Sequence, residues 1–211
     1  MILVGHCIQS NAPSIAFYEM ADNGGSRAMK FPVLVAVAFS FVLISGASTQ
    51  PTADLPTVFI VRHADRASVP VDDPGLTVAG QRRAEDLAAT LGNAGITAIV
   101  TTHLRRSRET AAPLTSKLKI DAQTFPLPSK GEKLEREQHI KEIVDAIRKQ
   151  KNGAVLVVGH ETTMPLIIAA LGGPKIAEIC SSVYDALFIL APSKEGVGFV
   201  STRYGAVTEC R

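Results

Sequence analysis

The sequence lacks tryptophan, has few aromatic residues and carries almost no net charge. Aromatic residues make up 5% of the 211 residues, and the formal net charge is +2. Proteins that bind nucleic acids usually present a strongly basic face or a platform of aromatic side chains. Neither is available here, so nucleic acid is not an expected partner. The 46% hydrophobic content suits one ordinary globular domain with a sizeable core.

Long hydrophobic runs are also scarce, apart from one near the N-terminus. Met29-Lys30 provides a basic start, an apolar run extends from Val33 to Ile44, and the small residues Ser45-Gly46-Ala47 follow. This order is typical of a secretory signal peptide. A membrane anchor is the alternative, but a span needs roughly 20 apolar residues and this run is shorter. We therefore expect cleavage after Ala47 and a periplasmic or secreted protein with no stable membrane association.

The chain accordingly divides into four expected segments. Residues 1–28 are interpreted as an upstream region that precedes the true start at Met29 and is not native to the protein. Residues 29–47 are the signal peptide, residues 48–56 are a polar linker, and residues 57–211 form the folded domain. The sequence makes no prediction of the oligomeric state.

Cysteine is sparse, and two of the three cysteines, Cys180 and Cys210, follow the expected cleavage point. They flank two strands expected at 186–190 and 198–203, whose short connecting loop indicates a hairpin. A hairpin brings its open ends together, and an oxidising compartment permits a disulfide. We therefore expect these two cysteines to pair; two unrelated buried thiols are the alternative.

Strand-like and helix-like patterns alternate along the rest of the chain. Apolar runs predict strands at 57–61, 96–100 and 154–158, with a further short strand at 122–125. Amphipathic or capped segments predict helices near 77–91, 104–118, 134–150 and 164–171. This alternation predicts an α/β fold: a three-layer α/β/α sandwich with a mostly parallel central sheet and an antiparallel C-terminal edge hairpin. The uninterrupted apolar run at 154–158 predicts a central, buried strand.

Polar residues follow three of these strands. Arg62-His63 ends the first strand, Arg106 begins the helix after the second, and His160 follows the run at 154–158. In open α/β sheets, ligands gather at the carboxyl ends of the strands. If the three strands are parallel neighbours, two imidazoles and two guanidiniums surround one pocket, and helix N-termini add N–H donors. Such a cationic pocket favours phosphate, which Arg binds with forked hydrogen bonds.

Four motifs in this order resemble those of the histidine phosphatase superfamily, in its small phosphoglycerate mutase-like branch 1 without a large cap domain. They are Arg62-His63-Ala64, Leu76-Thr77-Val78-Ala79-Gly80, Thr101-Thr102-His103-Leu104-Arg105-Arg106-Ser107-Arg108-Glu109-Thr110-Ala111 and Val155-Leu156-Val157-Val158-Gly159-His160. The resemblance extends from about Thr57 to Gly205. It departs from the family pattern at Ala64, where Gly is usual, and at Gly159, where Ser is frequent.

The resemblance implies a phosphoric monoester hydrolase of the histidine acid phosphatase type, acting on a small phosphorylated substrate. His63 would be the nucleophile that forms a phosphohistidine. Arg62, Arg106 and His160 would surround the transferring phosphoryl group. The resemblance implies no cofactor or metal, and no spacing of His, Cys or carboxylate residues in the sequence indicates a metal site.

The general acid stays open. Many family members use a carboxylate in the segment after the third strand, where Glu132, Glu135 and Glu137 are available here but no motif singles one out. Asp65 lies two residues after His63, and Glu161 directly follows His160, so either carboxyl group could protonate the leaving group. Each could equally be solvated or paired with an arginine. His139, on the third expected helix, is interpreted as exposed. Two other functions are compatible with the motifs: a non-catalytic phosphate- or glycan-binding relative, and a protein phosphohistidine phosphatase.

Overall fold

The computed structural model describes residues 55–128 and 133–211. The expected signal peptide and nearly all of the linker lie outside these residues, so those expectations stay predictions. The elements, in chain order, are β1 (Thr57–Arg62), α1 (Val78–Leu91), β2 (Ile96–Thr102), α2 (Arg105–Leu118), β3 (Ala122–Phe125), α3 (Lys133–Arg148), β4 (Ala154–Gly159), α4 (Met164–Ala170), β5 (Ala186–Ser193) and β6 (Gly196–Arg203).

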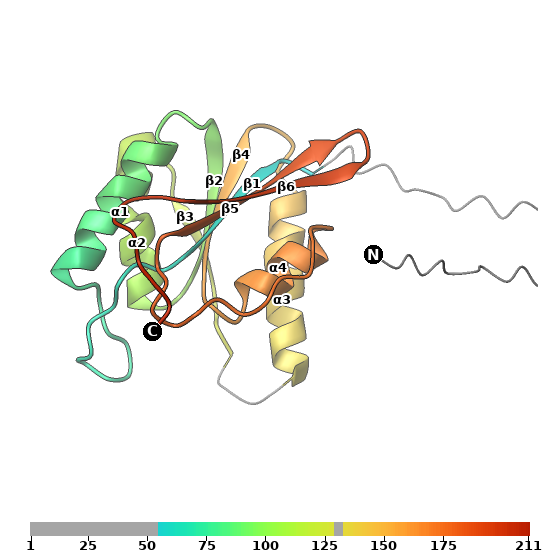
Figure 1. Cartoon of the computed structure of the whole chain (residues 1–211). Helices are drawn as coiled ribbons and strands as arrows, with labels where there is room; N and C mark the ends of the chain where they lie inside the picture. Colours follow the sequence, from blue (N-terminus) through green and yellow to red (C-terminus); the bar gives the residue numbers. More distant parts are fainter. Residues whose placement is uncertain (1–54, 129–132) are drawn as a thin grey trace, which may run out of the picture. The chain divides into compact units, whose positions relative to one another are not determined.

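The strands form a single six-stranded sheet in the order β3-β2-β4-β1-β5-β6 (Figure 1). The first four are mutually parallel, β5 runs antiparallel to β1, and β6 runs antiparallel to β5 at the edge. Every residue of β4 is buried, as its uninterrupted apolar run predicted. The sheet therefore confirms the predicted mostly parallel α/β fold with an antiparallel C-terminal hairpin.

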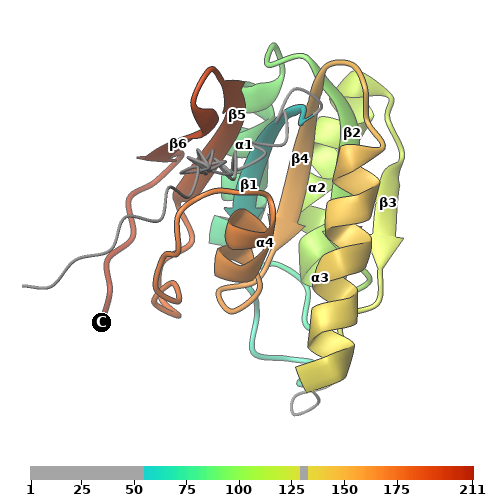
Figure 2. The ribbon, with the colours of Figure 1, turned by 90° about the vertical axis from the view of Figure 1, so that its right-hand side faces the viewer.

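Helices cover both faces of the sheet. One core cluster joins Val58 and Ile60 of β1 to residues of α3 and α4, which lie in front of the sheet in Figure 2. A second cluster joins Val61 of β1 to Leu87 of α1 and Leu114 of α2 on the opposite face. Among the described residues, no helix combines the length and the apolar character that crossing a membrane requires.

The segment Leu76 to Gly80 anchors the loop that follows β1. Thr77 caps α1, because its Oγ1 accepts a hydrogen bond from the Gly80 N–H at 3.0 Å. The Thr77 N–H in turn donates to the Asp65 carbonyl at 2.9 Å. A Cβ at position 80 would collide with that same carbonyl, so the close approach requires glycine. The start of α1 thereby fixes the backbone two residues after His63.

The ends of β1 and β4 lie side by side. Arg62 pairs with Gly159 in the parallel register, and the His63 N–H donates to the Gly159 carbonyl at 3.0 Å. His63 and His160, which directly follow these two strands, therefore lie at the same edge of the sheet. This register is the structural basis of the site described below.

The C-terminal tail returns from β6 to the loop that precedes β5. Cys180 and Cys210 form a disulfide, with their Cα atoms 5.6 Å apart. The Ser182 hydroxyl donates to the Glu209 carbonyl at 2.7 Å and accepts from the Arg211 N–H at 3.1 Å. We call the tail segment Thr208–Arg211, joined in this way to the loop Cys180–Tyr184, the tethered tail. Its contacts hold the loop close to the carboxyl end of β1.

Candidate active site

His63 lies at the end of β1 with its ring orientation fixed. The side chain is 2% exposed, and its Nδ1 lies 2.8 Å from the Ala64 carbonyl oxygen. A carbonyl can only accept, so Nδ1 carries the proton and Nε2 keeps its lone pair in the neutral ring. Burial lowers the pKa of His63 to about 3, and the charges of Arg62, Arg106 and Arg66 contribute further. At neutral pH the ring is an uncharged imidazole with a free Nε2.

His160 lies beside it, with the two ring centroids 5.2 Å apart. Its Nε2 lies 3.0 Å from the Thr102 hydroxyl, which donates to the Ser107 Oγ at 2.8 Å. With that hydrogen given to Ser107, the Thr102 oxygen accepts from the His160 Nε2–H. Burial lowers the pKa of His160 to about 2, with further contributions from His63 and Arg106. Two polar residues of β2 and α2 thus orient the second imidazole.

Arg62 is buried at 3% exposure and held by the loop before β5. Its Nη1 donates to the carbonyls of Ser181 at 2.7 Å and Val183 at 3.1 Å, with a longer contact of 3.4 Å to Cys180. The guanidinium carbon lies 4.2 Å from the centroid of the Tyr184 ring, a cation–π contact. The protein therefore fixes one side of the guanidinium. Nη2 has no hydrogen-bond partner among the described residues and is available to a ligand.

Arg106 lies in the first turn of α2. Its Nε is buried and has no hydrogen-bond partner among the described residues. Burial lowers the pKa of Arg106, and Arg66 acts in the same direction, while Asp73 and Glu161 oppose the shift. A buried donor without a partner costs free energy unless a ligand satisfies it. An anion at the N-terminus of α2 would do so and would also complement the helix dipole.

The two candidate acids are in different surroundings. Asp65 Oδ2 accepts from Arg83 Nε at 2.7 Å, and Arg83 is itself 4% exposed. The carboxylate is therefore the counter-charge of a buried guanidinium. Glu161 Oε2 lies 3.1 Å from Arg62 Nε, although that N–H does not point at the oxygen and makes no hydrogen bond. Glu161 also has a carboxylate oxygen within 4.8 Å of ring nitrogens of both His63 and His160.

The charges around this cluster favour an anion over a metal ion. His63, His160 and Glu161 are close enough together to supply three metal ligands. The guanidiniums of Arg62 and Arg106 nevertheless add two positive charges to the same region, and the single carboxylate is already next to Arg62. Like charges at short range repel a cation and attract a phosphate.

Two other histidines, His139 and His103, lie outside the cluster and differ in their burial. His139 is 2% exposed and neither ring nitrogen has a hydrogen-bond partner among the described residues, so the expectation of an exposed side chain was wrong. Burial lowers its pKa. Its spacing to Ile143 and Ala146, four and seven residues away, would have placed it on the apolar face of α3. His103 is an exposed loop residue whose Nδ1 accepts from the Leu127 N–H at 3.0 Å.

The site also contains residues that no motif indicated. Tyr184 contacts both Arg62 and His63, with 6.0 Å between its ring centroid and that of His63. Thr163 starts α4, but its hydroxyl accepts from the His160 N–H at 3.1 Å instead of capping the helix. The Tyr184 contacts have no local sequence signal, because tertiary packing brings its loop to the end of β1. The Thr163 contact spans only three residues, but the sequence does not distinguish it from a helix cap.

A protein-family model matches part of this sequence. The sequence profile of the histidine phosphatase superfamily (branch 1) matches residues 58–127. This segment contains the first three motifs, including Arg62, His63 and Arg106. A search of the curated proteins finds no significant match to the chain.

Solved structures with a similar fold include several enzymes. A candidate α-ribazole-5′-P phosphatase from Escherichia coli is 16% identical, with a TM-score of 0.57 over 72% of this chain and 98% of that one. The Entamoeba histolytica phosphoserine phosphatase bound to 3-phosphoglyceric acid is 13% identical, with a TM-score of 0.54 over 72% and 98%. The protein histidine phosphatase SixA complexed with tungstate is 19% identical, with a TM-score of 0.50 over 70% and 96%.

Proposed function

On the premise that this chain carries the sequence signature and the fold of the histidine phosphatase superfamily, branch 1, we propose that it hydrolyses a phosphomonoester through a phosphohistidine on His63. The observation that carries the proposal is the state of His63: a buried, neutral imidazole whose Nδ1–H is held by the Ala64 carbonyl. Such a ring offers Nε2 as a nucleophile at neutral pH. A site that only bound phosphate would gain more from a charged imidazolium.

In the first half-reaction, Nε2 of His63 attacks phosphorus opposite the ester oxygen. The P–N bond forms as the P–O bond breaks, and negative charge shifts to the departing oxygen. The imidazole becomes cationic as it is phosphorylated, and the Ala64 carbonyl, which accepts the Nδ1–H, stabilises that charge. The fixed ring orientation keeps Nε2 aligned for in-line attack.

The two arginines supply the charge that the equatorial oxygens require. The N–H donors available to a phosphoryl group include Nη2 of Arg62 and the Nε atoms of Arg62 and Arg106, both of which are buried without a hydrogen-bond partner among the described residues. The N-terminus of α2 adds a partial positive charge from the same side as Arg106. The phosphate group of the substrate is a dianion, and when it binds, its negative charge favours protonation of His160. The protonated ring then donates a hydrogen bond to another phosphoryl oxygen.

Glu161 is our proposed general acid. Its carboxyl group lies with the two imidazoles, whereas Asp65 is required as the partner of buried Arg83. Glu161 protonates the leaving oxygen in the first step. As a carboxylate it then takes a proton from the water that attacks the phosphohistidine, which frees phosphate and restores Nε2.

We also propose that the protein is exported, as a phosphatase of the histidine acid phosphatase type acting on small phosphorylated substrates. The leader pattern at residues 29–47 and the Cys180–Cys210 disulfide support this location, since disulfides persist in oxidising compartments. Intact-mass measurement of protein from the native host tests it: a mature chain starting near Ser48 is expected, and retention of residues 29–47 would contradict cleavage.

The decisive experiment is trapping of the phosphoenzyme. The protein is mixed briefly with a 32P-labelled monoester and quenched in alkali, because phosphohistidine is labile in acid. We expect label on the wild-type chain and none on His63→Ala, together with loss of p-nitrophenyl phosphate turnover. His103→Gln, an exposed histidine of the same chain, should label normally.

Three outcomes separate the proposed function from its alternatives. Tight phosphate binding without label or turnover from acid to neutral pH would indicate a non-catalytic phosphate- or glycan-binding relative. Rapid removal of phosphate from phosphohistidine in a peptide, with poor turnover of small esters, would indicate a protein phosphohistidine phosphatase. Label that persists on His63→Ala would place the nucleophile elsewhere.

A further inference from the structure

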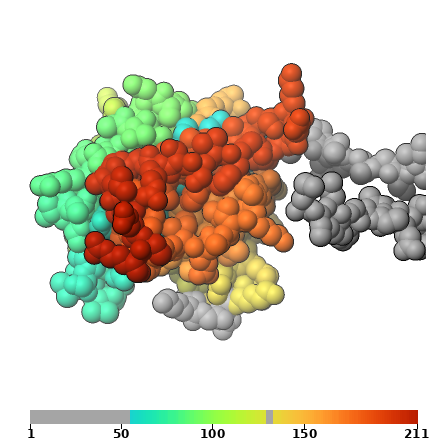
Figure 3. Space-filling view, in the orientation of Figure 1, coloured from blue at the N-terminus to red at the C-terminus, as the bar shows by residue number. Residues whose placement is uncertain are grey.

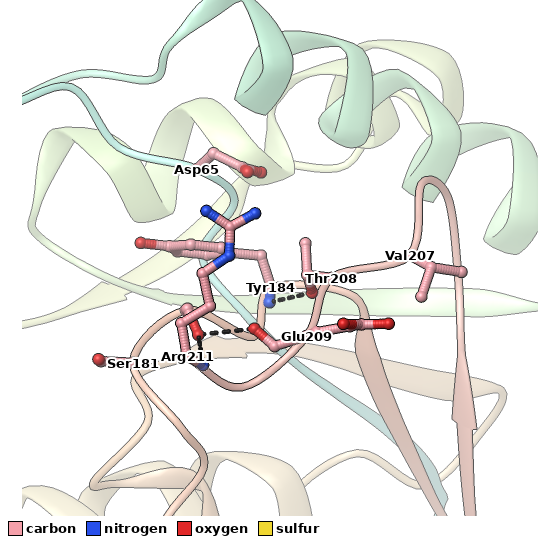
Figure 4. Close-up of a pocket in the computed structure, with 8 residues that line it drawn as sticks. Asp65, Ser181, Tyr184, Val207, Thr208, Glu209 and Arg211 are labelled. Carbon is pink, nitrogen blue, oxygen red and sulfur yellow. Dashed lines mark hydrogen bonds between the residues drawn. The ribbon is translucent and has the colours of Figure 1, made fainter.

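A second pocket opens next to the phosphate site and has no part in the chemistry described so far. It has a volume of about 630 Å³ and lies between the loop after β1 and the tethered tail (Figure 4). Its lining includes Asp65 on one side, Tyr184 beside the phosphate site, and Ser181, Thr208, Glu209 and Arg211 of the loop and the tethered tail. In the space-filling view the red C-terminal segment runs over the surface to the side where the cyan loop after β1 lies (Figure 3).

Tyr184 is shared by the pocket and the phosphate site. Its ring lies against the Arg62 guanidinium, at 4.2 Å, and its centroid is 6.0 Å from that of His63. Asp65 lines the same pocket and is two residues from His63 in the chain. A substrate with its phosphoryl group at His63 can therefore extend its remaining part along Tyr184 into this pocket.

The polar groups of the pocket fall into two sets. The hydroxyls of Ser182 and Thr208 are already used: Ser182 bonds to the Glu209 carbonyl, and Thr208 bonds to Asp185 at 2.6 Å and accepts from the Tyr184 N–H. These bonds and the disulfide fix the pocket wall before any ligand enters, which lowers the entropic cost of binding.

The second set is available to a ligand. The Glu209 carboxylate, the Ser181 hydroxyl and the Arg211 guanidinium make no side-chain hydrogen bond or ion pair with the described residues. Figure 4 shows the Arg211 side chain extending from the tail toward the Asp65 side of the pocket. The pocket therefore presents two carboxylates, one cation, a hydroxyl and an aromatic face.

This combination fits a leaving group with several hydroxyls. Hydroxyls donate to the carboxylates of Glu209 and Asp65, accept from Arg211, and leave C–H faces to pack on the Tyr184 ring. A carboxylate on the leaving group would be repelled by Glu209 and attracted only by Arg211, since Asp65 is already paired with Arg83, whereas hydroxyls can bond to all three side chains. Resting on the function proposed above, we infer that this pocket is the leaving-group subsite and that the substrate is the phosphate ester of a polyol or sugar.

Binding to a chain that cannot turn over tests the inference directly. Calorimetry on full-length His63→Ala should show glucose 6-phosphate binding about tenfold more tightly than ethyl phosphate, and also more tightly than 3-phosphoglycerate, which carries a carboxylate. Adding Glu209→Gln should remove most of that preference. Adding Glu195→Gln, in the exposed turn between β5 and β6, should keep it.

The outcomes distinguish this inference from the proposed function. Equal affinities for glucose 6-phosphate and ethyl phosphate, or a Glu209→Gln variant that weakens all three ligands alike, would overturn the subsite. The function would still stand if wild-type protein turned over p-nitrophenyl phosphate through His63. If p-nitrophenyl phosphate is not turned over but the preference and its loss in Glu209→Gln are observed, the subsite holds and the phosphatase proposal fails.

Discussion

The carboxylates of Asp65 and Glu161 both lie near His63, but they differ in the ion pairs that they form. Asp65 balances the charge of Arg83, which is buried and also donates to the Ala206 carbonyl at 2.7 Å. Giving a proton to a leaving group or taking one from water would disturb that ion pair. Glu161, at 32% exposure, is paired with the buried Arg62, but that ion pair lies within the phosphate site, where a bound phosphate can compensate the charge of Arg62 in place of Glu161. At the scale of single residues, acid–base work therefore belongs to Glu161.

We expect Glu161→Gln to lower kcat/KM for an alkyl phosphate by about 10²-fold or more, because an alkoxide is a poor leaving group without a proton donor. The loss should be much smaller for p-nitrophenyl phosphate, whose leaving group needs no proton. Asp65→Asn should chiefly lower Tm, since it leaves Arg83 without its counter-charge. Steady-state kinetics with both esters and thermal unfolding of each variant measure these effects. A leaving-group-dependent loss in Asp65→Asn alone would exchange the two roles.

The residues that the sequence could identify lie at the carboxyl ends of strands or, for Arg106, in the first turn of the helix that follows a strand. Arg62, His63 and His160 each leave a buried strand, and parallel pairing of β1 with β4 brings them together. Tyr184 was not identifiable, since it comes from a loop more than 120 positions after His63 in the chain. Its place depends on β5 pairing antiparallel with β1. Local patterns carry no information on such a contact.

At the scale of elements, the tethered tail links the disulfide to the phosphate site. Cys180 belongs to the loop whose carbonyls hold Arg62, and Cys210 fastens the tail to that loop. Without the crosslink, the loop is joined to the tail, within the described part of the chain, by the hydrogen bonds of Ser182 and Tyr184. The position of the Arg62 guanidinium would then become less well defined.

Replacing both cysteines, Cys180→Ser with Cys210→Ser, should reduce the free energy of unfolding by about 3–4 kcal/mol, the usual cost of opening a loop of this length. It should also raise KM for a monoester more than it lowers kcat, because Arg62 acts in binding phosphate. Chemical denaturation and steady-state kinetics test both parts. Ile147→Ala, in the core of α3, is the control: a comparable loss of stability with KM unchanged. Equal KM values in the cysteine variant and wild type would contradict the link.

At the scale of the whole molecule, the fold class could be predicted from the sequence. The spacing of the apolar residues and the positions of the turn residues indicate the same helices and strands along the chain. Mainly apolar runs marked β1, β2 and β4, and helical periodicity marked α1 and α3. The strand order β3-β2-β4-β1-β5-β6 was beyond local patterns, since β4 enters between β1 and β2 although it follows both. Because β4 lies next to β1 in this order, His63 and His160 lie side by side.

The same two buried histidines should make the stability of the domain depend on pH. In the folded chain the pKa of His63 lies near 3 and that of His160 near 2, whereas an unfolded histidine titrates near 6.5. Between these values the unfolded chain binds protons that the folded chain does not. The free energy of unfolding should therefore fall as pH decreases below about 6.5, by about 1.4 kcal/mol per pH unit for each histidine.

Urea unfolding at pH 7, 6 and 5 and constant ionic strength measures this dependence. The His63→Ala variant should lose the part of the slope that His63 contributes, while His160 and the buried His139, whose pKa values are also lowered, should still take up protons on unfolding. The matched variant His103→Gln changes an exposed side chain and should keep the full slope. A free energy of unfolding that stays constant from pH 7 to 5 would contradict the burial of two neutral imidazoles. It would also remove the basis for assigning Nε2 of His63 as the nucleophile.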